Sequence, residues 1–169
     1  MELGIYIHIP FCVKKCDYCD FISYSNCFDM QEKYVEKLLE EIEENKDLLK
    51  NNFISTIYIG GGTPSAIKSE LIKKILDKIY DVSRIDKEKV EITIEVNPGT
   101  ITKNNLQMYK DCGINRLSIG LQSTDDAIFK ASLLISIAVI SDCGKYFARD
   151  TAIAPLPVHK SNIFFALVF

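Results

Sequence analysis

Residues 8–21 read HIPFCVKKCDYCDF and place Cys12, Cys16 and Cys19 in one short stretch. A single cysteine is most often a small buried apolar residue, but three thiols this close together can surround one small object. They could hold a structural zinc ion, form a disulfide with one thiol left over, or bind an iron–sulfur cluster. Each alternative makes a different demand on the residues around the loop.

The spacing of the cysteines favours the cluster and leaves zinc open. A structural zinc ion usually takes four protein ligands. His8 is the only nearby fourth ligand, but its expected strand points it away from the loop, and we interpret it as a packed or hydrogen-bonded core histidine. A disulfide would leave one thiol unpaired and is disfavoured in a reducing compartment. A four-iron cluster on three thiolates keeps one iron free for a small chelating substrate.

The cysteine loop follows the first of four strands that the sequence predicts. Alternating or short apolar runs indicate these strands over residues 4–9, 55–61, 90–96 and 116–121. Helical patterns separate the strands, and such alternation at a spacing of roughly 30 residues is typical of parallel α/β architecture. We therefore expect an α/β fold built on a parallel sheet.

Three helices are expected between these strands. The first begins at Asp29, which can cap it together with Glu32 in a capping box. The second covers residues 70–80. The third lies between a cap at Thr102 and Gly113, a residue that suits the left-handed position just after a helix. A further helix is expected to begin at residue 123 or 124.

An unusual group of residues follows each expected strand. The cysteines follow the first strand, GGGTP (60–64) follows the second, Glu95 ends the third and Gln122 ends the fourth. Parallel α/β proteins bind ligands at the carboxyl ends of their strands. We therefore expect these groups on one rim of the sheet. There the glycines permit close backbone approach, Glu95 can accept hydrogen bonds from sugar hydroxyls, and Gln122 can donate and accept.

Composition is that of an ordinary globular protein. The 169 residues are 47% hydrophobic and 25% charged, and the net charge of −3 gives no reason to expect a nucleic-acid partner. The amino terminus does not resemble a secretory signal, and the apolar stretch 131–140 is too short for a transmembrane segment. We expect a cytoplasmic protein, in which six cysteines favour metal or redox chemistry. Cys27 and Cys112 have no partner at ligand spacing and are interpreted as structural.

The motif CxxxCxxC, with an aromatic residue directly before its last cysteine, resembles that of the radical S-adenosylmethionine (SAM) enzymes. The resemblance implies a [4Fe–4S] cluster, SAM chelated to the iron that lacks a protein ligand, and an electron donor such as flavodoxin or ferredoxin. Reduction of the cluster then cleaves SAM to methionine and a 5′-deoxyadenosyl radical. The implied cluster ligands are Cys12, Cys16 and Cys19, and the implied SAM contacts are Tyr6, Tyr18, Gly61, Gly62, Thr63, Glu95 and Gln122.

Five segments, YIHIPFC, CDYCDF, GGGTPS, EVNPGT and GINRLSIGLQS, narrow the resemblance to the oxygen-independent coproporphyrinogen III oxidase-like group. It covers residues 3–129 and implies the amino-terminal half of a partial (β/α)6 TIM-like barrel. The oxidases of this group have a further cysteine where the chain has Phe21. The chain therefore looks most like the heme chaperone branch, which binds heme and passes it to an acceptor protein. Oxidation of coproporphyrinogen III and a small zinc-binding interaction domain remain as alternatives.

The chain departs from the group after Phe129. Charged residues fall from 37 of the first 129 residues to 6 of the last 40, and Leu134 stands where the group has an arginine that helps to bind SAM. We therefore expect a partial radical SAM core domain over 1–129 and a tail unlike the family over 130–169. The tail is either a different genuine ending or the product of a frameshift or gene disruption. The second is favoured because unpatterned apolar residues do not suit a domain surface, and the chain is then a truncated form with little activity.

Overall fold

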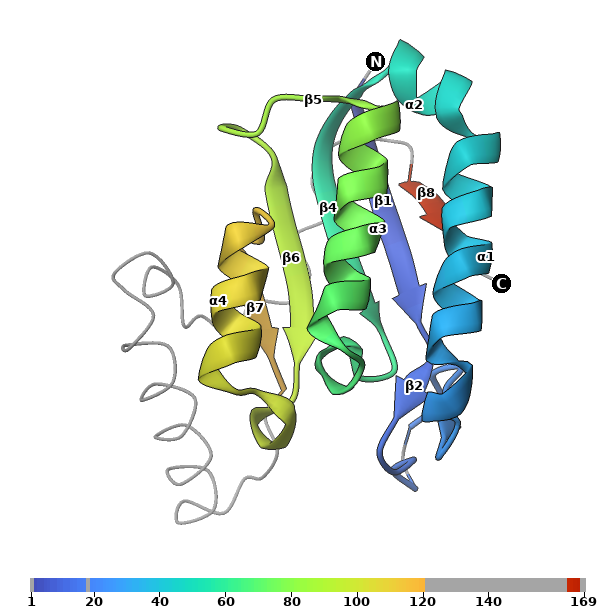
Figure 1. The fold of residues 1–169 in the computed structure, drawn as a ribbon, viewed down its shortest axis with the longest axis vertical. Helices are drawn as coiled ribbons and strands as arrows, with labels where there is room; N and C mark the ends of the chain where they lie inside the picture. The colour runs from blue at the N-terminus through green and yellow to red at the C-terminus, as the bar shows by residue number, and fades with distance from the viewer. Residues whose placement is uncertain (1, 18, 121–163, 168–169) are drawn as a thin grey trace.

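A computed structural model describes residues 2–17, 19–120 and 164–167, which form a parallel sheet with helices against it (Figure 1). The strand order is β7-β6-β4-β1-β8, and every neighbouring pair is parallel. The short β5 (Arg84–Ile85) pairs with the start of β4. The strands in this order are β1 (Glu2–Ile9), β4 (Phe53–Gly61), β6 (Glu91–Val96), β7 (Arg116–Ile119) and β8 (Phe164–Leu167).

Helices cover one face of this sheet. Figure 1 shows α1 (Gln31–Glu44), α3 (Ser69–Val82) and α4 (Lys103–Asp111) side by side on that face, and the short α2 (Lys46–Asn51) follows α1. Most side chains between helices and sheet are aliphatic, and burying each contributes roughly 1.5–3 kcal/mol. Those with no more than 1% exposure include Ile5, Ile7, Ile59, Ile92 and Ile94 from the strands and Leu38, Ile72, Ile75 and Leu106 from the helices.

The opposite face of the sheet is polar. Successive side chains of a strand point to opposite faces, so the residues between the buried isoleucines share the face that the helices do not cover. On β1, β4, β6 and β7 this set includes Tyr6, His8, Tyr58, Glu91, Thr93, Glu95, Arg116 and Ser118. This face, together with the carboxyl ends of its strands, positions the candidate site.

Two short strands enclose the cysteine loop beyond the end of β1. They are β2 (Phe11–Cys12) and β3 (Tyr24–Ser25), which pair in parallel. The Tyr24 amide also donates a hydrogen bond of 2.7 Å to the carbonyl oxygen of Pro10. The loop of residues 13–23 therefore leaves and rejoins the molecule at the same place. Single 3₁₀ turns follow β3, β4 and β6: η1 (Phe28–Met30), η2 (Pro64–Ala66) and η3 (Pro98–Thr100).

Most predicted elements are confirmed. The four expected strands appear as β1, β4, β6 and β7, and the expected helix over 70–80 appears as α3. Thr102 caps α4, because its hydroxyl accepts a 3.2 Å hydrogen bond from the Asn105 amide, and Gly113 follows α4 with φ +98°. The helix expected at residue 123 or 124 lies outside the described residues.

The predicted cap of the first helix is wrong. Asp29 lies inside η1, and α1 has Met30 at its cap position with no side-chain cap bond. The chain has already turned in η1 before α1 begins, so the Asp29 side chain comes too early to reach the free amides. Glu32 does not complete a capping box either, since it accepts a hydrogen bond from Lys68.

Candidate functional site at the carboxyl ends of the strands

The three loop cysteines lie at the carboxyl end of the sheet with very different exposure. Cys12 ends β2 and is 8% exposed, Cys19 is half-buried, and Cys16 is exposed. The Cys19 amide donates to the Cys16 carbonyl oxygen at 3.0 Å, so the two residues share one turn. Tyr18 lies outside the described residues. Within the described part of the chain no three His, Cys, Asp or Glu side chains are gathered for a metal ion, so ligation by the three thiols stays a prediction.

Hydrogen bonds join the glycine-rich segment to the end of β1 and to β2, which carries the first cysteine. The Gly62 amide donates to the Ile9 carbonyl oxygen at 2.9 Å, and the Thr63 amide donates to that of Phe11 at 2.8 Å. The Thr63 hydroxyl lies 3.6 Å from the Cys12 sulfur and donates to it. The structure therefore brings GGGTP and the cysteine loop together, as the sequence predicted for the shared rim.

Glycine is required here because neighbouring groups fill the space of a side chain. Gly61 has φ +114°, a conformation that L residues rarely adopt, and a Cβ there would lie 2.5 Å from the His8 ring. A Cβ on Gly62 would lie 2.8 Å from the Phe11 carbonyl oxygen. The close approach that the sequence analysis ascribed to a ligand is, in this structure, an approach to the protein's own β1 and β2.

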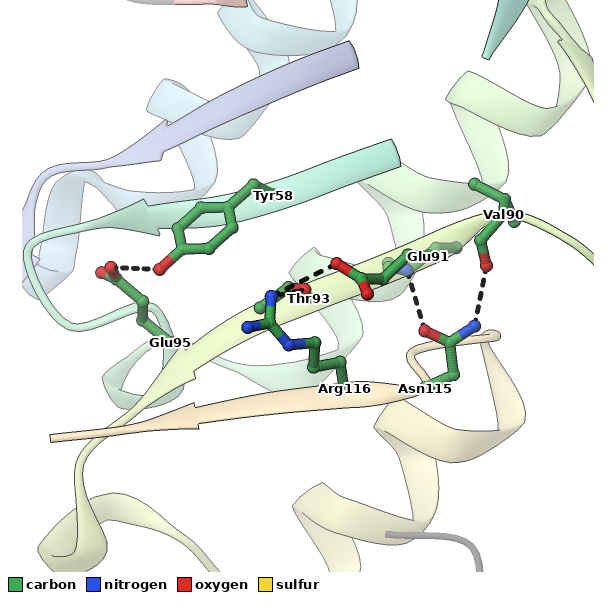
Figure 2. Close-up of polar contacts among 8 residues, drawn as sticks. Tyr58, Val90, Glu91, Thr93, Glu95, Asn115 and Arg116 are labelled. Atoms are coloured by element: carbon green, nitrogen blue, oxygen red, sulfur yellow. Dashed lines mark hydrogen bonds and ion pairs between the residues drawn. The ribbon is translucent and has the colours of Figure 1, made fainter. Parts of the chain in front are cut away.

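Glu95 lies at the end of β6 beside the glycine segment (Figure 2). One carboxylate oxygen accepts a 2.7 Å hydrogen bond from the Tyr58 hydroxyl, and the other accepts a 3.1 Å hydrogen bond from the Gly61 amide. Burial, and then the hydrogen bond to Glu95, raise the pKa of Tyr58 to about 12. The half-buried carboxylate is therefore oriented by two donors. Tyr58 was not among the residues that the sequence singled out.

Tyr6 and His8 form a second polar group on the adjacent β1. The Tyr6 hydroxyl lies 3.1 Å from His8 Nδ1, and His8 Nε2 lies 2.8 Å from the Ile22 carbonyl oxygen. The Tyr6 ring stacks on that of Tyr58 with 6.1 Å between centroids. His8 is 6% exposed, so the interpretation of a hydrogen-bonded core histidine is confirmed. Both ring nitrogens have partners, and His8 offers no free lone pair to a zinc ion.

A third polar group fixes β7 against β6 (Figure 2). The Asn115 side chain accepts from the Ile92 amide at 2.9 Å and donates to the Val90 carbonyl oxygen at 2.8 Å. Arg116 reaches Glu91 at 3.2 Å. Sequence reasoning missed these contacts, although a polar residue directly before the strand, Asn115, and another at its start, Arg116, were a signal for them. These contacts join β7 to β6, and Gln122 lies outside the described residues.

The other two cysteines that the structure describes, Cys27 and Cys112, do not belong to the cysteine loop. Cys112 is buried after α4, and burial raises the pKa of its thiol to about 11. The half-buried Cys27 donates to the Ser25 carbonyl oxygen at 3.4 Å. The burial of Cys112 and the hydrogen bond of Cys27 agree with the structural roles expected from sequence.

The donor set is compatible with an iron–sulfur cluster. Three thiols share one loop, and His8, the fourth ligand that the sequence suggested for zinc, is held by Tyr6 and by the Ile22 carbonyl oxygen. A cluster with three thiolate ligands needs no fourth side chain, whereas structural zinc sites are almost always four-coordinate. The residues therefore fit the cluster better than they fit zinc.

A sequence profile of the radical SAM superfamily matches residues 6–144. The chain belongs to this superfamily. The match runs past residue 129, where the sequence suggested a domain boundary, and that boundary stays a prediction. No helix in the ranges that the structure describes is long and apolar enough to cross a membrane.

Individual relatives place the chain near one branch of the superfamily. It is 46% identical over 129 residues to the heme chaperone HemW of Buchnera aphidicola subsp. Acyrthosiphon pisum, and 37% identical over 129 residues to that of Escherichia coli. Each of these alignments covers 76% of this chain and 34% of the relative. HemW of Synechocystis sp. is 34% identical over 170 residues, which is 96% of this chain and 38% of that protein.

The fold is similar to that of a solved radical SAM enzyme. Coproporphyrinogen III oxidase (HemN) from Escherichia coli superposes with a TM-score of 0.72 at 26% identity, over 83% of this chain and 34% of that one. The predicted α/β architecture with parallel strands is thereby confirmed. The chain spans about a third of the length of these relatives.

Proposed function

We propose that this chain binds a [4Fe–4S] cluster through Cys12, Cys16 and Cys19, and SAM beside it. The observation that carries the proposal is the pair of backbone hydrogen bonds from Gly62 and Thr63 to the carbonyl oxygens of Ile9 and Phe11. These bonds hold the segment implied to contact SAM against the strand that leads into the cysteine loop. When bound, the cluster supplies the electron that cleaves SAM.

The chain's own residues bind and orient SAM in this proposal. The backbone of Gly61, Gly62 and Thr63 contacts the amino group of SAM, and the Glu95 carboxylate accepts hydrogen bonds from the ribose hydroxyls of SAM. The hydrogen bonds of Glu95 to Tyr58 and Gly61 support that role, because they leave part of its acceptor capacity free. The side chains of Tyr6, Tyr18 and Gln122 complete the proposed contacts.

Within the superfamily we propose the heme chaperone type. The HemW relatives support it, as does Phe21, which is 65% exposed and stands where the oxidases have a cysteine. The proposed partners are a flavodoxin- or ferredoxin-like electron donor, heme, and a heme-accepting protein. Because the chain spans a third of its relatives' length, we expect little turnover from these 169 residues alone.

Metal analysis after anaerobic reconstitution tests the cluster assignment. The wild-type chain should hold about four iron and four sulfide ions per molecule. Cys12→Ser, Cys16→Ser and Cys19→Ser should each lose most of this content, and the matched control Cys27→Ser should keep it. One tightly held zinc ion without sulfide, or equal iron content in all four variants, contradicts the proposal.

A second assay tests the oxidase alternative, which a vinyl product would support. The wild-type chain is incubated with coproporphyrinogen III, SAM and a reductant, and the porphyrin products are separated by chromatography. The proposal predicts no vinyl product. Stoichiometric conversion to a divinyl product would assign oxidative decarboxylation instead.

A further inference from the structure

Tyr58 has a place in the site that neither the motifs nor the relatives' names assign. It lies on β4, two residues before the glycine segment, and its side chain is on the polar face of the sheet with Glu95 of β6 (Figure 2). We propose that Tyr58 is a positioning residue that orients the Glu95 carboxylate for the ribose hydroxyls of SAM. The inference rests on the proposed function, because it requires that SAM occupies this rim.

The geometry gives Tyr58 a defined task. Its hydroxyl donates to one oxygen of Glu95 at 2.7 Å while the Gly61 amide donates to the other oxygen at 3.1 Å. A carboxylate held at both oxygens cannot rotate freely about its last side-chain bond. An ionised carboxylate has about four acceptor sites, so about two remain for a vicinal diol.

The pair is built by residues from three strands. The Tyr6 ring of β1 stacks on Tyr58 with 6.1 Å between centroids and limits movement of the phenol. Gly60 leaves the space in which the pair lies, because a Cβ there would come within 2.8 Å of the Tyr58 ring and 3.1 Å of the Glu95 carboxyl carbon. The first glycine of GGGTP therefore serves the contact between Tyr58 and Glu95.

The direction of the hydrogen bond is fixed at neutral pH. Burial, the hydrogen bond to Glu95 and the charge of Glu95 together raise the pKa of Tyr58 to about 12. The phenol therefore stays protonated and donates a hydrogen bond to the carboxylate. The hydrogen bond with Ser118 and the charge of Arg116 act in the opposite direction and are outweighed.

Tyr58→Phe removes the hydroxyl and keeps the ring that stacks on Tyr6. Tyr80→Phe is the matched control, since Tyr80 is also half-buried and its hydroxyl donates to the Cys112 carbonyl oxygen at 3.0 Å, away from Glu95. Both variants are reconstituted anaerobically, their iron content is measured, and the Kd for SAM is obtained from titration of the EPR spectrum of the reduced cluster. Tyr58→Phe should weaken SAM binding about tenfold at unchanged iron content, and Tyr80→Phe should leave both quantities unchanged.

A double-mutant cycle separates positioning from a general structural effect. If Tyr58 acts through Glu95, Tyr58→Phe should weaken SAM binding about tenfold in the wild-type background and by less than about twofold in a Glu95→Gln background. Equal Kd values for wild type and Tyr58→Phe overturn the inference while leaving the proposed function intact. Equal losses in both backgrounds also overturn it. A wild-type chain that holds the cluster but binds no SAM overturns the inference and the SAM part of the proposed function together.

Discussion

Replacing Gly62 with alanine should loosen the attachment of the glycine segment to the cysteine loop. A Cβ at this position would lie 2.8 Å from the Phe11 carbonyl oxygen and 3.0 Å from that of Ile9. The first distance is about 0.6 Å shorter than an ordinary contact of 3.4 Å. Both neighbours are backbone atoms and cannot rotate away, so the strand and the glycine segment must separate.

The size of the effect follows from two contributions. Overpacking a tight site costs about 2 kcal/mol. The hydrogen bonds from the amides of Gly62 and Thr63, now 2.9 and 2.8 Å long, lengthen when the segments separate. Weakening them adds about 1 kcal/mol. A total near 3 kcal/mol corresponds to a fall in Tm of roughly 6–12 °C for a chain of this size.

Thermal unfolding of the metal-free chain, followed by circular dichroism, measures the fall in Tm caused by Gly62→Ala. Iron retention after reconstitution measures whether the cysteine loop still holds the cluster. Gly99→Ala is the control on the same rim, because among the described residues a Cβ there meets only the Asn97 side chain, at 3.4 Å. Its Tm should change by less than about 2 °C. A Gly62→Ala chain with wild-type Tm and wild-type iron retention refutes the close packing of the two segments.

Three other measurements test separate parts of the fold. Ile75→Ala in α3 should lower the free energy of unfolding in urea by about 3 kcal/mol, because this fully buried side chain packs between helix and sheet. Thr102→Ala should cost about 1 kcal/mol through the lost cap of α4, whereas Asp29→Ala, which removes no cap, should stay within about 0.5 kcal/mol of wild type. Above pH 9 the Tm should fall with pH up to 11. Burial raises the pKa of the Cys112 thiol from 9.0 to about 11, so the unfolded chain releases this proton first and the stabilisation present below pH 9 is lost. A Tm that is constant or rises over this pH range contradicts that reasoning.

Periodicity predicted the elements of the fold because each strand and helix has one consistently apolar side. Val35, Leu38 and Ile42 of α1 and the alternating isoleucines of β1 are all buried. The cap at Asp29 failed because a 3₁₀ turn, which leaves no periodic signal in so few residues, comes before the helix. The pairing of β8 with β1 was also not foreseen, since it joins residues far apart in sequence.

The candidate site was only partly predictable for a related reason. Short motifs identified the residues that end each strand, and the parallel order of the strands implied one shared rim. The contact between Tyr58 and Glu95 spans 37 positions in the sequence and depends on the register that sets Tyr58 opposite Thr93. The hydrophobic pattern of each strand fixes which residues share a face, but which residue lies opposite which depends on the packing of the whole sheet.

We propose that the three loop thiolates hold a cluster with one iron left for SAM. The most direct measurement is electron–nuclear double resonance on the reduced, reconstituted chain, with SAM labelled with ¹⁵N at its amino group. Chelation of the open iron predicts a ¹⁵N coupling to the cluster spin that disappears when unlabelled SAM is used. A stable reduced cluster whose spectrum is unchanged by SAM, with no ¹⁵N coupling, would contradict the claim.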